Sequence, residues 1–248
     1  MNTQDVTDRV EAASALMLDI ETAPDDDAVS YLLSDPPSFD APGNYKDEAK
    51  IAAYVEDKRK TWVRDVRKKA GLEWRTGRVI SCAMMAGDGT GLEVVHLGAE
   101  VYQDSEAYLL EAVAQRVAKC GQLVTFNGHS FDVPYLRMRM AKHGVKVPAQ
   151  LLDGRYPTNP NGTHIDVRLV CTGGDKRAKG RQGEWARFLG IREMPTPNPL
   201  TETGIPIDGS DITALSDAGE WDAIAAYNAV DVQTLCAMWN ALHLAGLA

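Results

Sequence analysis

Two carboxylates lie two positions apart in the apolar run LMLDIET, near the start of this 248-residue chain. Side chains alternate along a strand, so Asp19 and Glu21 share one face while Leu18 and Ile20 face the core. Neighbouring carboxylates at the end of a buried strand repel each other unless protons or a cation neutralise them. A hard divalent cation with oxygen ligands would do so. Taken alone, a D-x-E pair is also compatible with two exposed acids at a strand end.

A third acid follows a turn signal in the segment NGHSFD. Asn127 and Gly128 predict a sharp turn after a strand, and Asp132 falls in the first turn of the helix that follows. The N-terminus of a helix stabilises a carboxylate. Asp132 could therefore be a catalytic ligand or simply a favourable charge at the start of a helix.

A fourth acid shares a predicted helix face with a phenol in the segment YNAVD. Tyr227 and Asp231 are four residues apart, so their side chains project together. The alternative is an amphipathic helix whose tyrosine packs and whose aspartate is solvated. None of the three motifs identifies a site by itself.

The elements that would position these residues are strands followed by helices. Apolar runs between turn signals predict strands at residues 15–20, 78–86, 92–97, 122–126 and 164–170. Helical periodicity predicts helices at residues 47–70, 105–119, 131–143 and 220–244. The composition of residues 25–44, 153–163 and 193–210, rich in Pro, Gly or polar residues, predicts irregular segments. A hairpin followed by strand–helix alternation favours an α/β fold with a mixed sheet flanked by helices.

The charge distribution is uneven. The formal net charge is -9, whereas binding to phosphate groups favours Lys and Arg. A site that holds cations needs its own acids, however, and local basic patches remain available. Cations gather in the predicted helix at residues 58–69 and in the glycine-rich stretch 176–181. Each patch is either a solvated surface or a set of phosphate contacts.

The cysteines and the N-terminus indicate the compartment. Cys82, Cys120, Cys171 and Cys236 lack metal-binding spacing and are expected to be reduced thiols. The acidic, polar N-terminus is unlike a signal peptide, and no apolar run approaches the ~20 residues of a membrane span. These features predict a cytoplasmic protein without a membrane segment.

The three motifs in the order D-x-E, N-x-x-x-F-D and Y-x-x-x-D resemble the DEDD exonuclease superfamily, which has a ribonuclease-H-like fold. The tyrosine branch, DEDDy, is indicated because Ala226 stands where the other branch would carry histidine. The segments LDIET and NGHSFD resemble motifs in the exonuclease domain of family B DNA polymerases. They are most similar to those of stand-alone bacterial or phage exonucleases related to that domain. The resemblance implies one 3′–5′ exonuclease domain over residues 1–248, with a core at about 15–245 and insertions at about 25–77 and 153–210.

The resemblance also implies a metal site and a mechanism. Asp19, Glu21, Asp132 and Asp231 would hold two Mg²⁺ or Mn²⁺ ions ~4 Å apart. Asp19 would bridge both ions, Glu21 and Asp231 would complete the site that activates water, and Asp132 would support the second ion, directly or through water. Tyr227 would position the nucleophile, because a phenol with a pKa of ~10 is a poor base at neutral pH.

The expected substrate is single-stranded DNA or a DNA 3′ end, with a partner in replication or recombination left open. Thr22 and Asn127 flank the acids and could bind the terminal nucleotide. Phe131 could stack on a base or belong to the core. Asp166 could line the cleft without being a ligand. An exoribonuclease would use the same site chemistry. A non-catalytic nucleic-acid-binding relative is the remaining alternative, and the presence of all four acids argues against it.

Overall fold

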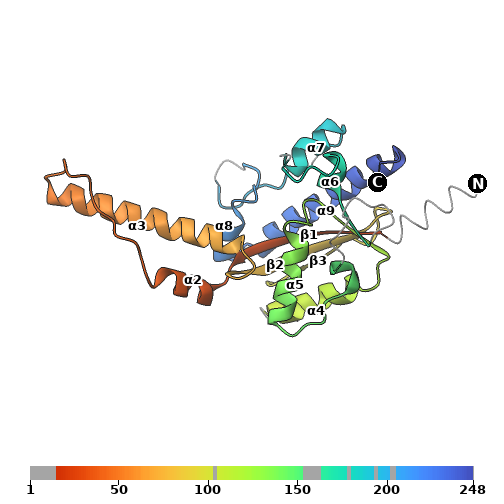
Figure 1. Ribbon diagram of the computed structural model, residues 1–248, viewed down its shortest axis with the longest axis horizontal. Coiled ribbons are helices and arrows are strands. Elements are labelled where there is room, and N and C mark those ends of the chain that lie inside the picture. The colour runs from red at the N-terminus through yellow and green to blue at the C-terminus, as the bar shows by residue number, and fades with distance from the viewer. Residues whose placement is uncertain are drawn as a thin grey trace, which may run out of the picture.

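A mixed sheet of five strands forms the centre of the molecule (Figure 1). The computed structural model describes residues 15–102, 105–152, 163–177, 180–192, 195–201 and 205–247. The strands are β1 (Ala15–Pro24), β2 (Gly77–Ala86), β3 (Glu93–His96), β4 (Gln122–Thr125) and β5 (His164–Asp166). Their order is β3-β2-β1-β4-β5, with β1 antiparallel to β2 and parallel to β4. The predicted α/β fold with a mixed sheet is confirmed.

Helices cover both faces of this sheet. On one face lie α4 (Glu106–Val117) and α5 (Asp132–Lys142). The other face is covered by α9 (Trp221–Leu244), against which α6 (Val167–Cys171) and α7 (Gln182–Phe188) pack. Short 3-10 turns at Glu100–Tyr102 and Ala149–Leu151 complete this part of the chain. None of the helices in the described ranges combines the length and apolar character needed to cross a membrane.

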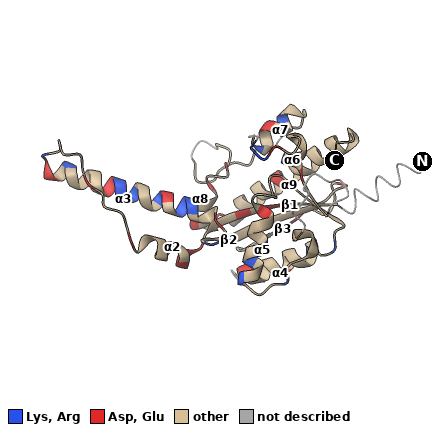
Figure 2. Ribbon diagram, viewed as in Figure 1, with Lys and Arg blue, Asp and Glu red and all other residues tan. Residues whose placement is uncertain are grey.

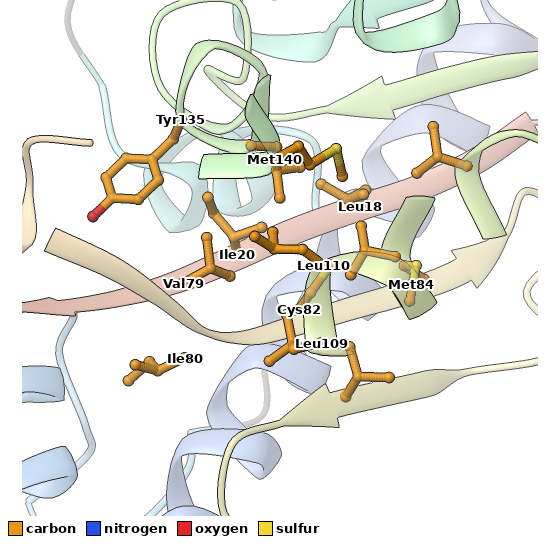
Figure 3. Packing of buried hydrophobic residues seen from close by; sticks show 14 of the residues in the cluster. Leu18, Ile20, Val79, Ile80, Cys82, Met84, Leu109, Leu110, Tyr135 and Met140 are labelled. Carbon is orange, nitrogen blue, oxygen red and sulfur yellow. The ribbon is translucent and has the colours of Figure 1, made fainter. Parts of the chain in front are cut away.

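Two hydrophobic cores lie on opposite sides of β1. Leu18 and Ile20 belong to the core that α4 and α5 cover (Figure 3). Met17 belongs to the core beneath α9, together with Val232 and Leu235 of that helix. Because side chains alternate along a strand, the two acids of β1 continue the row of Met17 toward α9. Strand alternation predicts Leu18 and Ile20 in the core, and the structure confirms it.

A long helix projects from this body (Figure 1). It is α3 (Glu48–Gly71), and its buried residues, Ala70 and Gly71, are at its C-terminal end, where it contacts β1 and α8 (Ile212–Ala218). A further helix, α2 (Asp26–Leu33), lies in a stretch predicted to be irregular, so that prediction was wrong. Its start carries a cap, because the Asp25 carboxylate accepts a hydrogen bond from the backbone N–H of Ala28.

Two predicted strand boundaries were also wrong. β1 continues past residue 20 to Pro24, because β2 pairs with it along that whole length, with a bulge between Glu21 and Thr22. The two acids therefore lie within the strand rather than at its end. The strand predicted at 164–170 ends at Asp166, whose side chain accepts backbone hydrogen bonds that start α6. Val167 and Val170, which follow Asp166, are β-branched and favour a strand, which explains the longer prediction.

Candidate active site

Three carboxylates from two elements converge beside the bulge of β1. Asp19 and Glu21 project from β1, and Asp231 projects from α9. Each offers one oxygen, and these three oxygens all lie within 4.8 Å of one another. Bulges recur next to active sites because they redirect a side chain and locally end the strand pairing. Oxygen ligands grouped in this way are the donor set that a hard divalent cation prefers.

The electrostatics of this group favour a bound cation. Burial raises the pKa of Asp19 well above its usual value, and the charges of Asp132, Asp231 and Glu21 raise it further. Burial likewise raises the pKa of Glu21, followed by repulsion from Asp231 and Asp132. The free carboxylates therefore destabilise one another, and a divalent cation would relieve that repulsion. The residues present fit a divalent metal site.

Asn228, which was not among the predicted site residues, holds Asp19 in place. Its side chain is fully buried. Its amide donates a 2.7 Å hydrogen bond to Oδ2 of Asp19 and accepts one of 2.8 Å from the hydroxyl of Ser81 on β2. A signal was available, since Ile224, Asn228 and Val232 form one row at four-residue spacing on α9. An asparagine in an otherwise apolar row indicates a specific polar partner.

Asp132 lies beside this group rather than within it. It is buried at the start of α5, and its Oδ1 accepts a 3.2 Å hydrogen bond from the backbone N–H of Ile20. That N–H needs such a partner because β4 ends at Thr125 while β1 continues. Burial raises the pKa of Asp132 to about 7, and its hydrogen bonds oppose the rise. Of the four predicted ligands, the structure thus gathers three and places Asp132 next to them.

The turn before α5 is held by a buried acid. Asn127 has a left-handed backbone with φ of 64°, which asparagine tolerates better than most residues. Gly128 packs so tightly that a Cβ there would lie 2.2 Å from Oγ1 of Thr125. Asp166 is fully buried and accepts hydrogen bonds from the backbone N–H groups of Asn127 and His129, at 2.9 and 3.0 Å. Asp166 therefore shapes the loop that leads to Asp132.

A cleft whose lining includes arginines opens beside the carboxylates. Two cavities of about 500 Å³ and about 420 Å³ share Arg181, Gln182, Asp208 and Tyr227 as lining residues. The larger cavity also includes Asp231, and the smaller one includes Asn127 and Arg168. Arg181 donates a 2.7 Å hydrogen bond to Asp208, which joins the segment before α7 to the loop before α8. Guanidinium groups beside a carboxylate cluster that fits a divalent cation suit an anionic substrate.

Tyr227 borders this cleft one helical turn before Asp231. Its side chain is half-buried. Burial raises the pKa of Tyr227, and the charges of Asp231 and Glu21 add to the rise. A phenol is already a poor base at neutral pH, and a further rise in its pKa makes it a poorer one, so donating a hydrogen bond is the role that fits Tyr227.

The residues predicted to contact substrate do not all line the cleft. Asn127 lines the cleft. Thr22 is buried and its side chain hydrogen-bonds Tyr135, and the ring of Phe131 packs 5.4 Å from the ring of Tyr135. The structure thus places Thr22 and Phe131 against a core residue of α5.

A family model described as a predicted 3′–5′ exonuclease related to the exonuclease domain of PolB matches residues 72–245. Among solved structures, the chain is similar to the family B DNA polymerase from the hyperthermophilic archaeon Pyrobaculum calidifontis, with a TM-score of 0.54 and 16% identity. The match covers 92% of this chain and 24% of the polymerase. At this identity the likeness shows the fold, which is ribonuclease-H-like. No protein with a curated description matches.

Proposed function

Because the chain belongs to the family of predicted 3′–5′ exonucleases related to the exonuclease domain of PolB, we propose that it removes nucleotides from the 3′ end of single-stranded DNA. The observation that carries this proposal is the group of Asp19, Glu21 and Asp231, whose oxygens lie within 4.8 Å of one another beside a cleft that Arg181 and Arg187 line. Metal-assisted phosphodiester hydrolysis combines metal ligands with groups that attract phosphate in this way.

The proposed cofactors are two Mg²⁺ or Mn²⁺ ions. Asp19, Glu21 and Asp231 would hold one ion, and Asp132 would help to hold the second. When bound, the ions supply Lewis-acid chemistry, lowering the pKa of water and neutralising the charge that develops on the departing 3′ oxygen. Every other contribution comes from the side chains of the chain itself.

Asn228 and Ser81 orient Asp19, since the amide of Asn228 hydrogen-bonds both of them. A fixed carboxylate costs no reorganisation when the substrate arrives. The protonated phenol of Tyr227 would donate a hydrogen bond to the attacking water or to a phosphate oxygen. These residues position groups for the reaction, which is the main contribution of a protein to phosphoryl chemistry.

Arg181 is proposed to attract the substrate phosphate. Its present partner is Asp208, and both side chains are largely exposed, at 81% and 50%. An exposed ion pair of this kind contributes little to stability. A phosphate entering the cleft can therefore compete with Asp208 for the guanidinium group.

The test is a cleavage assay with single-stranded DNA, double-stranded DNA and RNA of the same sequence, labelled at either end. Removal from the 3′ end predicts a descending ladder from 5′-labelled DNA and immediate release of a mononucleotide from 3′-labelled DNA. EDTA should abolish cleavage, and Mg²⁺ or Mn²⁺ should restore it. Asp19→Asn and Asp231→Asn, checked for folding by circular dichroism, are the controls. Cleavage of RNA alone would replace DNA as the proposed substrate, and unchanged cleavage by Asp19→Asn would overturn the proposed site.

A further inference from the structure

The projecting helix α3 is positively charged in an acidic protein. It carries eight cationic and four acidic side chains, although the chain as a whole has a formal net charge of -9. Figure 2 shows these cations along the helix where it extends away from the sheet. A local excess of cations on an acidic chain favours contact with a polyanion.

Three of these cations form one exposed row. Lys60, Arg64 and Lys68 are spaced four residues apart, so they share a face of α3 and repeat every ~6 Å along it. All three are exposed. Lys60 pairs with Glu56 at 3.7 Å and Arg64 with Asp65 at 3.6 Å, and all four of these side chains are more than half exposed. Such pairs are weak, so phosphate groups can displace them.

The opposite side of α3 is covered by the chain that leads into it. On that side the ring of Phe39 packs 5.8 Å from Trp62. Nearer the start of the helix, the ring of Tyr45 packs 5.7 Å from Tyr54, which lies on a flank of α3. Trp62 is two residues from both Lys60 and Arg64, which places it on the far side of the helix. The incoming segment therefore supports the helix and leaves the row of Lys60, Arg64 and Lys68 open to solvent.

The base of α3 is fixed to the body next to the cleft. The hydroxyl of Tyr135 donates a 3.0 Å hydrogen bond to the carbonyl of Gly71. Arg67 pairs with Asp217 of α8 at 2.6 Å and with Asp26 of α2 at 3.6 Å. This pairing turns the side of α3 that carries Arg67 toward α8. The loop that precedes α8 contains Asp208, a lining residue of the cleft.

The path from the acids to the row is short. A Cβ on Gly71 would lie 3.3 Å from the backbone of Pro24, so the base of α3 touches the end of β1. Pro24 is three residues beyond Glu21, which is ~10 Å along a strand. Lys68 and Lys60 lie a further ~5 and ~16 Å along α3 from Gly71. In Figure 1, β1 runs toward the base of α3, and the helix continues away from the sheet.

From this arrangement we infer that α3 is an arm that binds the phosphate backbone of the substrate strand upstream of its 3′ end, through Lys60, Arg64 and Lys68. The inference rests on the proposed function, because it places the 3′ end at the carboxylates. It adds a separate binding surface for the nucleotides that are not being cleaved. Substrates too short to extend from the cleft to the row cannot use it.

The test compares two triple variants of α3 that remove equal charge. The arm variant is Lys60→Gln, Arg64→Gln and Lys68→Gln. The control variant is Lys58→Gln, Arg59→Gln and Lys69→Gln, which changes exposed cations on the side of the helix that carries Trp62. A third variant, Lys60→Arg, Arg64→Lys and Lys68→Arg, keeps the charge of the row. Circular dichroism melting shows whether each variant remains folded.

Binding is measured by fluorescence anisotropy on an Asp19→Asn background, with a labelled single strand of about 12 nucleotides. The arm variant should bind about tenfold more weakly, and the slope of log affinity against log salt should fall by about 2, at about 0.7 for each phosphate contact. The control and charge-keeping variants should bind as the parent does. Equal weakening of the arm and control variants, or none in either, would overturn the inference.

Hydrolysis separates this inference from the proposed function. With wild-type Asp19, the arm variant should cleave a dinucleotide at the parental rate and the longer strand with a raised KM. If the parent cleaves DNA and the arm variant matches it on both substrates, the inference fails and the exonuclease stands. If the parent cleaves neither substrate but the arm variant still loses affinity for the longer strand, the proposed function fails and the arm remains a binding surface.

Discussion

The side-chain amide of Asn228 donates a 2.7 Å hydrogen bond to Asp19, a residue 209 positions away in the sequence. The same amide accepts a hydrogen bond from Ser81 on β2. One buried residue of α9 thus links the neighbouring strands β1 and β2 at the candidate metal site. This contact is also the one that lowers the pKa of Asp19, in surroundings that otherwise raise it.

Replacing Asn228 should weaken the metal site without removing a ligand. We expect Asn228→Ala to reduce metal affinity or activity about 10- to 100-fold, because residues that orient a ligand typically have effects of that size. The lost partner of the Ser81 hydroxyl should also cost about 1–3 kcal/mol of unfolding free energy. Metal titration of activity and a denaturant melt measure the two effects. Ser81→Ala, which keeps the contact with Asp19, is the matched control and should affect activity less.

The metal-free protein should lose stability as the pH rises. The folded-state pKa values of Asp19, Glu21 and Asp132 are raised above their usual values, that of Asp132 to about 7. Groups with raised pKa values contribute stability that is fully present below the unfolded value of ~4 and is lost as the pH rises through the folded value.

Added Mg²⁺ should therefore raise the melting temperature more near pH 8 than near pH 5, because at low pH protons already neutralise the carboxylates. Differential scanning fluorimetry with EDTA or Mg²⁺ at both pH values measures this. Asp19→Asn with Asp132→Asn should flatten the dependence. A Mg²⁺ shift of equal size at both pH values would contradict the prediction.

Tyr227→Phe should slow the reaction without stopping it. The loss of one hydrogen bond at the reacting groups corresponds to about a tenfold fall in kcat. Because the pKa of Tyr227 is raised, the phenol does not titrate near neutrality, and the pH–rate profile of the variant should keep its shape. Steady-state rates across a pH series provide the measurement. If the pH–rate profile of Tyr227→Phe lost one side of its pH dependence, the phenol would act as a base.

Arg181→Gln should raise KM for DNA more than it lowers kcat, since Arg181 lies on the cleft wall and its proposed role is to attract phosphate. Asp208→Asn should lower KM or leave it unchanged, because it releases Arg181 from its ion pair. Arg177→Gln removes an exposed cation of the neighbouring segment, which pairs with Asp175. It is the control for charge alone. Steady-state kinetics of the three variants on the same single-stranded DNA provide the measurement. Equal effects of Arg177→Gln and Arg181→Gln would contradict a specific role of Arg181.

Local periodicity was enough to place several residues. Alternation along a strand put Asp19 and Glu21 on one face, with Leu18 and Ile20 on the other, and the structure agrees. Helical spacing placed Asp231 on a face of α9, and the predicted bounds of α3, α5 and α9 differ by at most one residue at each end from those observed. These features depend on the geometry of one element, which the sequence of that element determines.

The tertiary structure decided which polar groups meet. Nothing near Asp132 in the sequence shows that its carboxylate binds the backbone of Ile20, and nothing near Asn228 shows that its amide binds Asp19. The sequence near Thr22 likewise does not indicate that its side chain lies against Tyr135. A hydrogen bond depends on distances of about 3 Å between atoms. Such distances are set by the packing of β1, α5 and α9 against one another, and a pattern within one segment carries no information about them.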